Sequence, residues 1–261
     1  MRVAVVGNLS LDHVEGAPPR PGGPPRYAAR SLAALGVPAL VRAKSAAIDR
    51  AALVRPFEEL GVPVEWRPGE TTATYAFSYD GDARSMEVRE LGSSWSPEDV
   101  ADLDADWVHV GALFRGEFPE ETLAALAATA RLSFDGQGLV RPARVGPLEL
   151  EPDPDTSFLR HVSVLKLSEE EARALVGSLE EEALSGVGVP EVVVTLGSRG
   201  AIVVAEGRLA RIPADPVDAD PTGAGDAFAA AYVAERSRAE EPLHAAELAT
   251  RLVHGLLGGS R

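Results

Sequence analysis

Residues 220–233 read DPTGAGDAFAAAYV, and the rest of the chain is organised around this stretch. Gly223, Ala224 and Gly225 are small enough for their backbone N–H groups to converge on one point, and the helix-compatible residues after them place this turn at a helix N-terminus. Such a turn favours an anion. Asp226 stands beside it with an ordinary pKa of about 4, so it is ionised at neutral pH and can accept a proton. The stretch predicts a base next to an anion-binding turn, with a simple glycine-rich turn as the alternative.

Composition narrows the classes of function that remain. The chain has 261 residues, and we expect a single domain over residues 1–261. Its 25 Lys and Arg against 40 Asp and Glu give a net charge of −15, which argues against nucleic acid and anionic membranes as partners. There is no cysteine, and the five His lack the spacing of a metal site. Neither a membrane-spanning apolar run nor a leader is present, so we expect a cytoplasmic protein.

Apolar, β-branched runs alternate with helix-compatible segments, which predicts an α/β fold with a mainly parallel sheet covered on both faces. No G-x-G-x-x-G follows the first strand and no P-loop motif occurs, so neither common nucleotide fold is supported. The expected strands are residues 2–7, 37–43, 62–66, 107–110, 131–134, 162–167 and 192–196, with a hairpin over 201–205 and 208–212 around Gly207. The expected helices are residues 25–35, 49–60, 119–130, 169–176 and 243–257, and one after Gly225.

One pair of segments departs from this alternation. Residues 71–79 and 85–91 are rich in Thr, Tyr and Phe and are joined by Asp-Gly-Asp at 80–82, which predicts a hairpin with a face toward solvent. A hairpin inserted in a βα chain suggests a lid over the main sheet. We assign the lid to residues 68–92 together with 9–21, a polar and proline-rich loop or short excursion.

The segment Asp-Pro-Thr-Gly-Ala-Gly-Asp at 220–226 resembles the signature of the ribokinase-like (PfkB) carbohydrate kinases. The resemblance implies a three-layer αβα ribokinase-like domain with a small β lid, and ATP-dependent phosphoryl transfer. It also implies Asp226 as the base, and Gly223, Ala224 and Gly225 as the anion hole. The usual second residue of the signature is Thr, whereas Pro221 stands here and supplies no N–H.

The resemblance also implies an acceptor site near the first strand. Asp12 follows that strand, where open α/β sheets bind ligands, and in the family an Asp here holds sugar hydroxyls. Gly22 and Gly23 let the substrate approach the backbone. Tyr27 stands where many members have an Asn that bonds a sugar hydroxyl, which resembles inositol-kinase and nucleoside-kinase members. The alternative is a solvated loop Asp beside a simple glycine turn.

Residues 135–141, DGQGLVR, resemble a D-x-Q-G-x-x-R segment of inositol-kinase-like members. This resemblance implies that Gln137 and Arg141 donate hydrogen bonds to polyol hydroxyls on the side that faces the lid. A glycine loop with a surface Arg is the alternative. Asn8 and Gln137 are also the chain's single Asn and single Gln, and both fall in segments assigned to the substrate side.

Lys166, Ser168 and Glu171 lie at a strand-to-helix junction. Ser168 and Glu171 have the spacing of a capping box. The family has N-x-x-E here, whose Glu holds the water network of Mg²⁺, so Glu171 is our candidate for the metal shell although Ser168 replaces the Asn. We assign Lys166 and Ser168 to cofactor binding.

Residues 195–200, TLGSRG, resemble the nucleotide loop of the family. Small and hydroxyl residues after a buried strand let phosphates and ribose lie against the backbone, which assigns Thr195, Gly197 and Gly200 to cofactor binding.

These motifs lead to one functional hypothesis with open alternatives. We expect a kinase that uses ATP and Mg²⁺ to phosphorylate a hydroxyl of a sugar or inositol-like acceptor, with a nucleoside kinase as the alternative and a non-catalytic sugar-binding protein as a rival from another class. Relatives differ in using a monovalent cation, which these motifs do not indicate. We expect a monomer or a homodimer formed through the lids.

Overall fold

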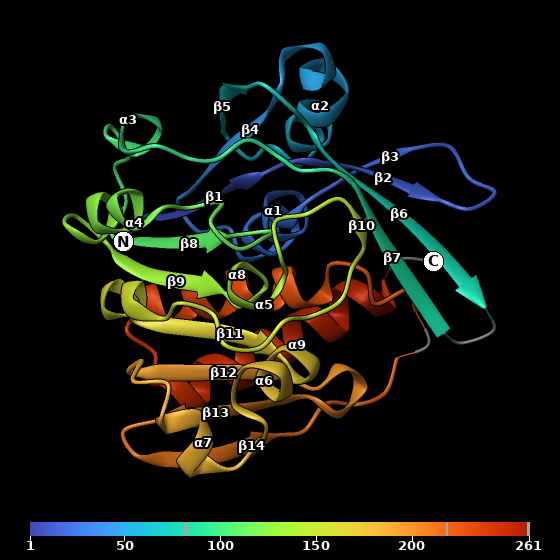
Figure 1. Ribbon diagram of the computed structural model, residues 1–261. Helices are drawn as coiled ribbons and strands as arrows, with labels where there is room; N and C mark the ends of the chain where they lie inside the picture. The colour runs from blue at the N-terminus through green and yellow to red at the C-terminus, as the bar shows by residue number, and fades with distance from the viewer. Residues whose placement is uncertain (81–82, 218, 260–261) are drawn as a thin grey trace.

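The computed structural model describes residues 1–80, 83–217 and 219–259, and within these residues it contains two β-sheets (Figure 1). The larger sheet has nine described strands in the order β14-β13-β12-β11-β9-β8-β1-β4-β5. Strands from β5 to β12 pair in parallel, and β13 and β14 form an antiparallel hairpin at one edge. The mainly parallel sheet expected from the sequence is therefore confirmed. The strands are β1 (Val3–Asn8), β4 (Ala39–Ala46), β5 (Val64–Gly69), β8 (Trp107–Gly111), β9 (Arg131–Asp135), β11 (Val164–Ser168), β12 (Glu191–Thr195), β13 (Ala201–Ala205) and β14 (Arg208–Ile212).

Helices cover both faces of this sheet. Side chains of a strand point alternately to opposite faces, so in β1 Val3 and Val5 enter one core cluster while Ala4 and Val6 enter the other. The first cluster is closed by α1 (Pro24–Leu35), α2 (Arg50–Leu60), α8 (Ala224–Ser237) and α9 (Pro242–Gly258). The second is closed by α3 (Pro97–Val100), α4 (Glu120–Ala127), α6 (Glu169–Val176) and α7 (Glu181–Ser185). The result is a three-layer αβα arrangement.

A smaller sheet forms the lid. Its order is β10-β7-β6-β2-β3, and its strands are β2 (Ser10–Val14), β3 (Arg20–Gly22), β6 (Ala73–Asp80), β7 (Ala83–Glu90) and β10 (Gly146–Pro147). The predicted hairpin is confirmed as β6 and β7, whereas its turn residues 81–82 lie outside the described residues. Residues 9–21, expected as a loop or short excursion of the lid, include β2 and most of β3 of this sheet, because β2 pairs with β6 and β3 pairs with β2.

The lid lies over the carboxyl ends of the parallel strands. Figure 1 shows the arrows of β8 and β9 pointing toward the side on which β6 and β7 project. One apolar cluster joins the two sheets: Tyr75, Phe77 and Val88 of the lid pack with Leu113 and Phe114, which follow β8. In open α/β sheets the crevice outside the carboxyl ends of the strands is the usual ligand site. The fold therefore places a candidate cleft between this edge and the lid.

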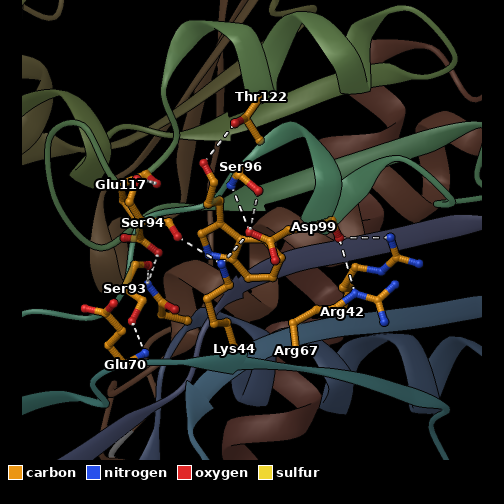
Figure 2. Close-up of polar contacts among 12 residues, drawn as sticks. Arg42, Lys44, Arg67, Glu70, Ser93, Ser94, Ser96, Asp99, Glu117 and Thr122 are labelled. Carbon is orange, nitrogen blue, oxygen red and sulfur yellow. Dashed lines mark hydrogen bonds and ion pairs between the residues drawn. The ribbon is translucent and has the colours of Figure 1, made fainter.

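A polar network surrounds two buried basic residues of β4, Arg42 and Lys44 (Figure 2). Lys44 donates to the carbonyl of Ser94 and to the carboxylate of Asp99, and its ammonium lies 4.7 Å from the centre of the Trp95 ring. The side chain of Arg42 is only 1% exposed, and it pairs with the carboxylates of Glu65 and Asp102. Removing two charges from water is costly unless they are paired, and these contacts provide the pairing.

Several short elements escaped the sequence patterns. They are α5 (Gln137–Val140), η1 (Ala47–Asp49), η2 (Ser157–His161) and η3 (Gly197–Arg199), together with α3, α7 and β10. Each spans five residues or fewer, too short to show a period. α4 also ends at Ala127 rather than at residue 130, and α8 already includes Ala224. Among the described residues, no helix combines the length and apolarity needed to cross a membrane.

Candidate active site

The anion-binding turn predicted at residues 223–225 forms the N-terminus of α8. Gly223 is the N-cap with φ 77°, a left-handed conformation that favours glycine, and α8 begins at Ala224. The turn is closed by the N–H of Ala224, which donates to the carbonyl of Pro221 over 3.0 Å, and by Asp220, whose carboxylate accepts from the N–H of Thr222 at 2.9 Å. Pro221 therefore contributes a carbonyl here, although it lacks the N–H of the usual Thr.

Asp226 lies in the first turn of α8 and is buried. Burial, reinforced by the nearby carboxylate of Asp135, raises its pKa to about 7, although the charges of Lys166 and Arg141 act in the opposite direction. Its Oδ1 atom is buried and has no hydrogen-bond partner among the described residues. A carboxyl group that titrates near neutral pH and has an unused oxygen has the properties of a general base.

Lys166 lies directly beneath the anion-binding turn. A Cβ built on Gly225 would lie 2.9 Å from its Nζ atom, so the ammonium lies against the backbone of the turn. Nζ also pairs with Oδ2 of Asp135 at 3.1 Å, across the neighbouring strands β11 and β9. Burial alone would lower the pKa of Lys166, but Asp135, Glu171 and Asp226 outweigh it and raise the pKa. The site therefore contains a permanent, enclosed cation.

Glu171 has the capping role that its spacing with Ser168 predicts. Its carboxylate accepts from the N–H of Ser168 at 2.8 Å, and the hydroxyl of Ser168 accepts from the N–H of Glu171 at 3.2 Å. Burial raises the pKa of Glu171, while Lys166 opposes the rise. Its Oε1 faces Nη2 of Arg141 at 3.9 Å, so the carboxylate also lies beside the charged cluster. Both alternatives for Glu171, the cap and a position near the cofactor site, are compatible with this geometry.

No three His, Cys, Asp or Glu residues of the described segments form a metal-binding group. Mg²⁺ is commonly held by one or two carboxylates together with water and substrate phosphates rather than by a protein cage. Glu171 fits that pattern, because its carboxylate lies beside the charged cluster. It would hold the ion through water and through the phosphates of a donor.

The acceptor side is formed by β2, β3 and the start of α1. Asp12 is buried in β2, where the hydroxyl of Ser10 donates to its Oδ1 at 2.7 Å. A Cβ on Gly22 would lie 2.2 Å from Oδ2 of Asp12, so this position requires glycine for a close approach. Gly23 has φ 93° and its Cβ would lie 2.6 Å from the carbonyl of Asn8. The Gly-Gly pair thus brings the N-terminus of α1 close to the first strand.

The short helix α5 and the residue that follows it contribute two polar side chains to the candidate site, Gln137 and Arg141. Gln137 is buried, and its backbone N–H donates to Oδ1 of Asp135 at 3.1 Å. Arg141 follows α5, and its Nε atom is buried without a partner in the described chain. Its charge acts on Asp226 and on Tyr75 of the lid, so Arg141 is near both. The alternative of a surface Arg is wrong, because its side chain is only 16% exposed.

The proposed cofactor loop lies beyond the end of β12, next to the junction at Ser168. Thr195 pairs in register with Ser168, and its hydroxyl donates to the carbonyl of Leu167 at 3.3 Å. Gly197 opens η3 with φ 59°. Gly200 has φ 92°, and a Cβ there would lie 2.0 Å from the carbonyl of Ile212. The fold therefore brings this loop to the same edge of the sheet as the anion-binding turn.

Two residues of the site were missed from the sequence. Asp135 was noted as part of a motif but given no role, and only strand register reveals that it pairs with Lys166. Glu117 is fully buried, and its carboxylate accepts from the N–H groups of Leu113 and Phe114 and from the side-chain amide of Asn8 at 2.8 Å. Burial raises the pKa of Glu117 to about 8. It supports the segment that packs against the lid.

Comparisons with known proteins show the family to which the chain belongs. A model described as pfkB family carbohydrate kinase matches residues 11–252. The chain belongs to the pfkB family. This pfkB chain is 33% identical over 153 residues to a fructokinase of Klebsiella pneumoniae, a match that covers 53% of the chain and 48% of that enzyme. The chain thus spans about half the length of this curated relative.

Solved structures extend the similarity of this pfkB chain over nearly its whole length. A pyrophosphate-dependent kinase in the ribokinase family, complexed with a pyrophosphate analog and myo-inositol, has a TM-score of 0.84 at 22% identity and covers 98% of this chain and 95% of its own. A nucleoside kinase of Burkholderia thailandensis in complex with inosine has a TM-score of 0.77 at 20% identity, with 98% and 90% covered. A fructokinase of Vibrio cholerae with fructose, ADP and calcium has a TM-score of 0.72 at 21% identity, and the match covers 97% of this chain and 90% of the fructokinase. These likenesses establish a ribokinase-like fold.

Proposed function

We propose that this protein is a phosphotransferase that phosphorylates a hydroxyl of a small polyhydroxylated acceptor, a sugar or an inositol. The observation that carries the proposal is Asp226, a buried carboxyl group with a pKa of about 7 and an unpartnered Oδ1, in the first turn of the helix that begins at the anion-binding turn. A static phosphate-binding site would gain nothing from a carboxylate there. A base that deprotonates an attacking hydroxyl requires one.

In the proposed reaction, Asp12 accepts hydrogen bonds from acceptor hydroxyls while Asp226 takes the proton of the reacting hydroxyl. The acceptor oxygen forms a bond to the terminal phosphorus of the donor, and the bond from that phosphorus to the donor's bridging oxygen breaks. The backbone N–H groups of Gly223 and Gly225 stabilise the charge on the transferred phosphoryl oxygens, while the N–H of Ala224 remains bonded to the carbonyl of Pro221. Lys166 adds a fixed positive charge directly beneath them.

Two further groups support the donor side. Thr195, Gly197 and Gly200 form the loop against which we propose that ATP lies. Glu171 is the candidate to hold Mg²⁺, which would neutralise charge that develops on the phosphates. We propose that the acceptor binds between the lid and the sheet, with Arg141 and Gln137 as additional donors of hydrogen bonds.

Inorganic pyrophosphate is a second candidate donor. The specific observation in its favour is the pair of cations at the anion-binding turn: Lys166 is enclosed against Gly225, and the Nε of Arg141 has no partner among the described residues. A compact donor that carries its charge on phosphates alone can be held by such groups without nucleoside contacts. One structural neighbour is a pyrophosphate-dependent kinase.

The test is a two-dimensional panel of donors and acceptors. ATP or pyrophosphate is combined in Mg²⁺ buffer with fructose, ribose, myo-inositol and inosine, and release of ADP or of inorganic phosphate is measured. We expect acceptor-dependent turnover with a sugar or inositol, and none above background in Asp226→Asn. Turnover with inosine alone would favour the nucleoside alternative. Binding by calorimetry without turnover in any combination would instead favour the non-catalytic sugar-binding alternative.

A further inference from the structure

Asp135 is a fully buried carboxyl group that has no part in the proposed reaction. It is the last residue of β9, and the register of β9 against β11 places it beside Lys166. Its Oδ2 pairs with Nζ of Lys166 at 3.1 Å, and its Oδ1 accepts from the backbone N–H of Gln137 at 3.1 Å, at the start of α5. Asp135 therefore joins the enclosed cation of the anion-binding turn to the helix on the acceptor side.

The ammonium of Lys166 lies between Asp135 and the candidate base. A Cβ built on Gly225 would lie 2.9 Å from Nζ, and Gly225 is the residue immediately before Asp226. In the described parts of the chain Lys166 nevertheless forms its ion pair with Asp135, and Oδ1 of Asp226 has no hydrogen-bond partner. An ammonium that turned to Asp226 would occupy the oxygen that must accept the proton of the attacking hydroxyl.

The surroundings of Lys166 show what would happen without Asp135. Burial lowers the pKa of Lys166, and the carboxylates that raise it are, in order of effect, Asp135, Glu171 and Asp226. Glu171 already accepts from the N–H of Ser168 through one oxygen, and its other oxygen faces Arg141 at 3.9 Å. Asp226 has an oxygen with no partner in the described residues, so it is the carboxylate to which a released ammonium would turn.

We propose that Asp135 is a positioning residue for phosphoryl transfer, which holds the Lys166 ammonium against the anion-binding turn and keeps it from pairing with Asp226. The proposal rests on the proposed function and deepens it, because it accounts for a base and a cation that act side by side without neutralising each other. Lys166 stays available to the phosphoryl oxygens, and Asp226 stays available to the attacking hydroxyl. Asp135 acts only through Lys166.

The pH dependence of the rate reports this arrangement, because Asp226 must be ionised to act as a base. Burial raises the pKa of Asp226 to about 7, and Asp135 is the next-largest cause and acts in the same direction. The other charged groups that act on Asp226 come from further elements: Lys166 of β11, Arg141 beyond α5 and Glu171 of α6.

Two more titratable side chains lie within electrostatic range of this cluster and keep a single charge state during the assay. Burial lowers the pKa of His109 in β8 to about 4, so its imidazole is neutral. Burial raises the pKa of Tyr27 in α1 above its usual value, so its phenol keeps its proton. A change in the pH profile between roughly pH 5 and pH 9 is therefore not caused by either of them.

The test compares Asp135→Asn with Asp99→Asn, using the donor and acceptor that wild type turns over fastest. Asp99 of α3 is a matched control because it pairs with Lys44, whose side chain is 5% exposed like that of Lys166, away from the candidate site. We expect Asp135→Asn to lower kcat at least about tenfold. The pH at which kcat/KM is half its maximum is expected to fall by about one pH unit, because Lys166 then pairs with Asp226. Asp99→Asn is expected to lower Tm and to leave both kinetic quantities unchanged.

The two KM values separate the two contacts of Asp135. Asn keeps an oxygen that accepts from the N–H of Gln137, so α5 stays in place and the acceptor KM is expected to stay within about twofold. The donor KM is expected to rise about tenfold, because the ammonium no longer lies against the turn. A rise in the acceptor KM with an unchanged pH profile would assign Asp135 to the support of α5 alone and would overturn the proposal.

A double variant keeps the proposal testable if Asp135→Asn does not fold. Asp135→Asn combined with Lys166→Met removes both buried charges, and replacing both members of a buried pair disturbs folding less than removing one. Because Asp135 acts through Lys166, kcat of the double variant is expected to equal that of Lys166→Met within about twofold. A further tenfold fall in the double variant would show that Asp135 acts without Lys166, and would overturn the proposal.

The outcomes separate this inference from the proposed function. If wild type turns over an acceptor and Asp135→Asn keeps the kcat and pH profile of wild type, the proposed kinase stands and the role of Asp135 falls. If no acceptor is turned over with either donor, both fall together. If kcat/KM still falls below pH 7 in Asp226→Asn, the pH profile belongs to another group and the proposal for Asp135 also falls.

Discussion

Asp226 combines a buried position with a pKa of about 7, and both features have measurable consequences. Asp226→Asn keeps the size of the side chain and removes the proton acceptor, so kcat is expected to fall by about 10²–10⁴-fold. In wild type, kcat/KM is expected to fall about tenfold per pH unit below pH 7, because the base becomes protonated. In Asp226→Asn this fall of kcat/KM below pH 7 is absent. If Asp226→Asn has a near-normal kcat, or still loses kcat/KM below pH 7, Asp226 is not the base.

The carboxyl group of Asp226 also makes the free energy of unfolding depend on pH. Because its folded pKa is above the unfolded value near 4, the folded state holds the extra proton between about pH 4 and pH 7. The contribution of the protonated Asp226 to the free energy of unfolding is therefore fully present below pH 4 and is lost as the pH rises through 7. We expect Asp226→Asn to have a higher Tm than wild type at pH 8, with the difference vanishing near pH 4. Thermal melts at the two pH values test this, and a lower Tm at pH 8 would contradict it.

Glu171 is expected to act on the metal as well as on its helix. Glu171→Gln keeps an oxygen that accepts from the N–H of Ser168, so the cap survives and the change in Tm is small. The loss of charge is expected to shift the Mg²⁺ dependence of the rate to higher concentration, by about tenfold. Ser168→Ala is the matched control, because it removes the cap and leaves the carboxylate. Equal Mg²⁺ titrations for wild type and Glu171→Gln would leave Glu171 as a capping residue only.

At the scale of elements, the contact between α1 and α8 is the part of the site where we expect substitutions to be tolerated least. Gly223→Ala places a methyl group where the Tyr27 ring lies and forces a positive φ on alanine. Gly36→Ala, at the end of α1, imposes a similar φ of 58° but meets nothing within 4 Å. We expect Gly36→Ala to cost about 1–2 kcal/mol in free energy of unfolding, with activity unchanged. Gly223→Ala is expected to cost more and to lower kcat at least tenfold.

Denaturant unfolding and steady-state kinetics on the two glycine variants separate strain from steric overlap. Equal losses of stability in Gly223→Ala and Gly36→Ala, with normal kcat in both, would mean that the contact between Gly223 and Tyr27 does not position the anion-binding turn.

At the scale of the whole molecule, stability and chemistry are located in different regions. Arg42 is buried in β4 and pairs with Glu65 of β5 and with Asp102, beyond α3, whereas the candidate site lies at the carboxyl ends of other strands. Arg42→Met is expected to cost about 1.5–3 kcal/mol, because it removes the buried hydrogen bonds of the guanidinium to Glu65 and Asp102, although Asp102 keeps its pair with Arg67. The control is Arg55→Met, an exposed pair with Glu59 that is worth under about 1 kcal/mol.

For both variants, kcat and KM are expected to match wild type at a temperature where the proteins remain folded. Loss of activity in folded Arg42→Met would show that the network on β4 also controls the site, and the separation of stability from chemistry would then be wrong.

The sequence by itself determined the long strands and helices of the main sheet and their order, because long apolar runs and strong helix ends are local signals. The capping box of Ser168 and Glu171 and the glycine N-cap at 223 are both visible in a few residues, and both are present in the structure. The signature at residues 220–226 likewise located the anion-binding turn.

Only the tertiary structure decided which distant residues meet. Residues 9–21 have few apolar side chains, and they become strands because β6 supplies the pairing partners for β2. Asp135 is one polar residue after an apolar run, and only the register of β9 against β11 pairs it with Lys166. Tyr27 lies almost two hundred residues from Gly223, and the packing of α1 on α8 brings the ring to the turn. Such contacts depend on long-range packing, which no local pattern of residues encodes.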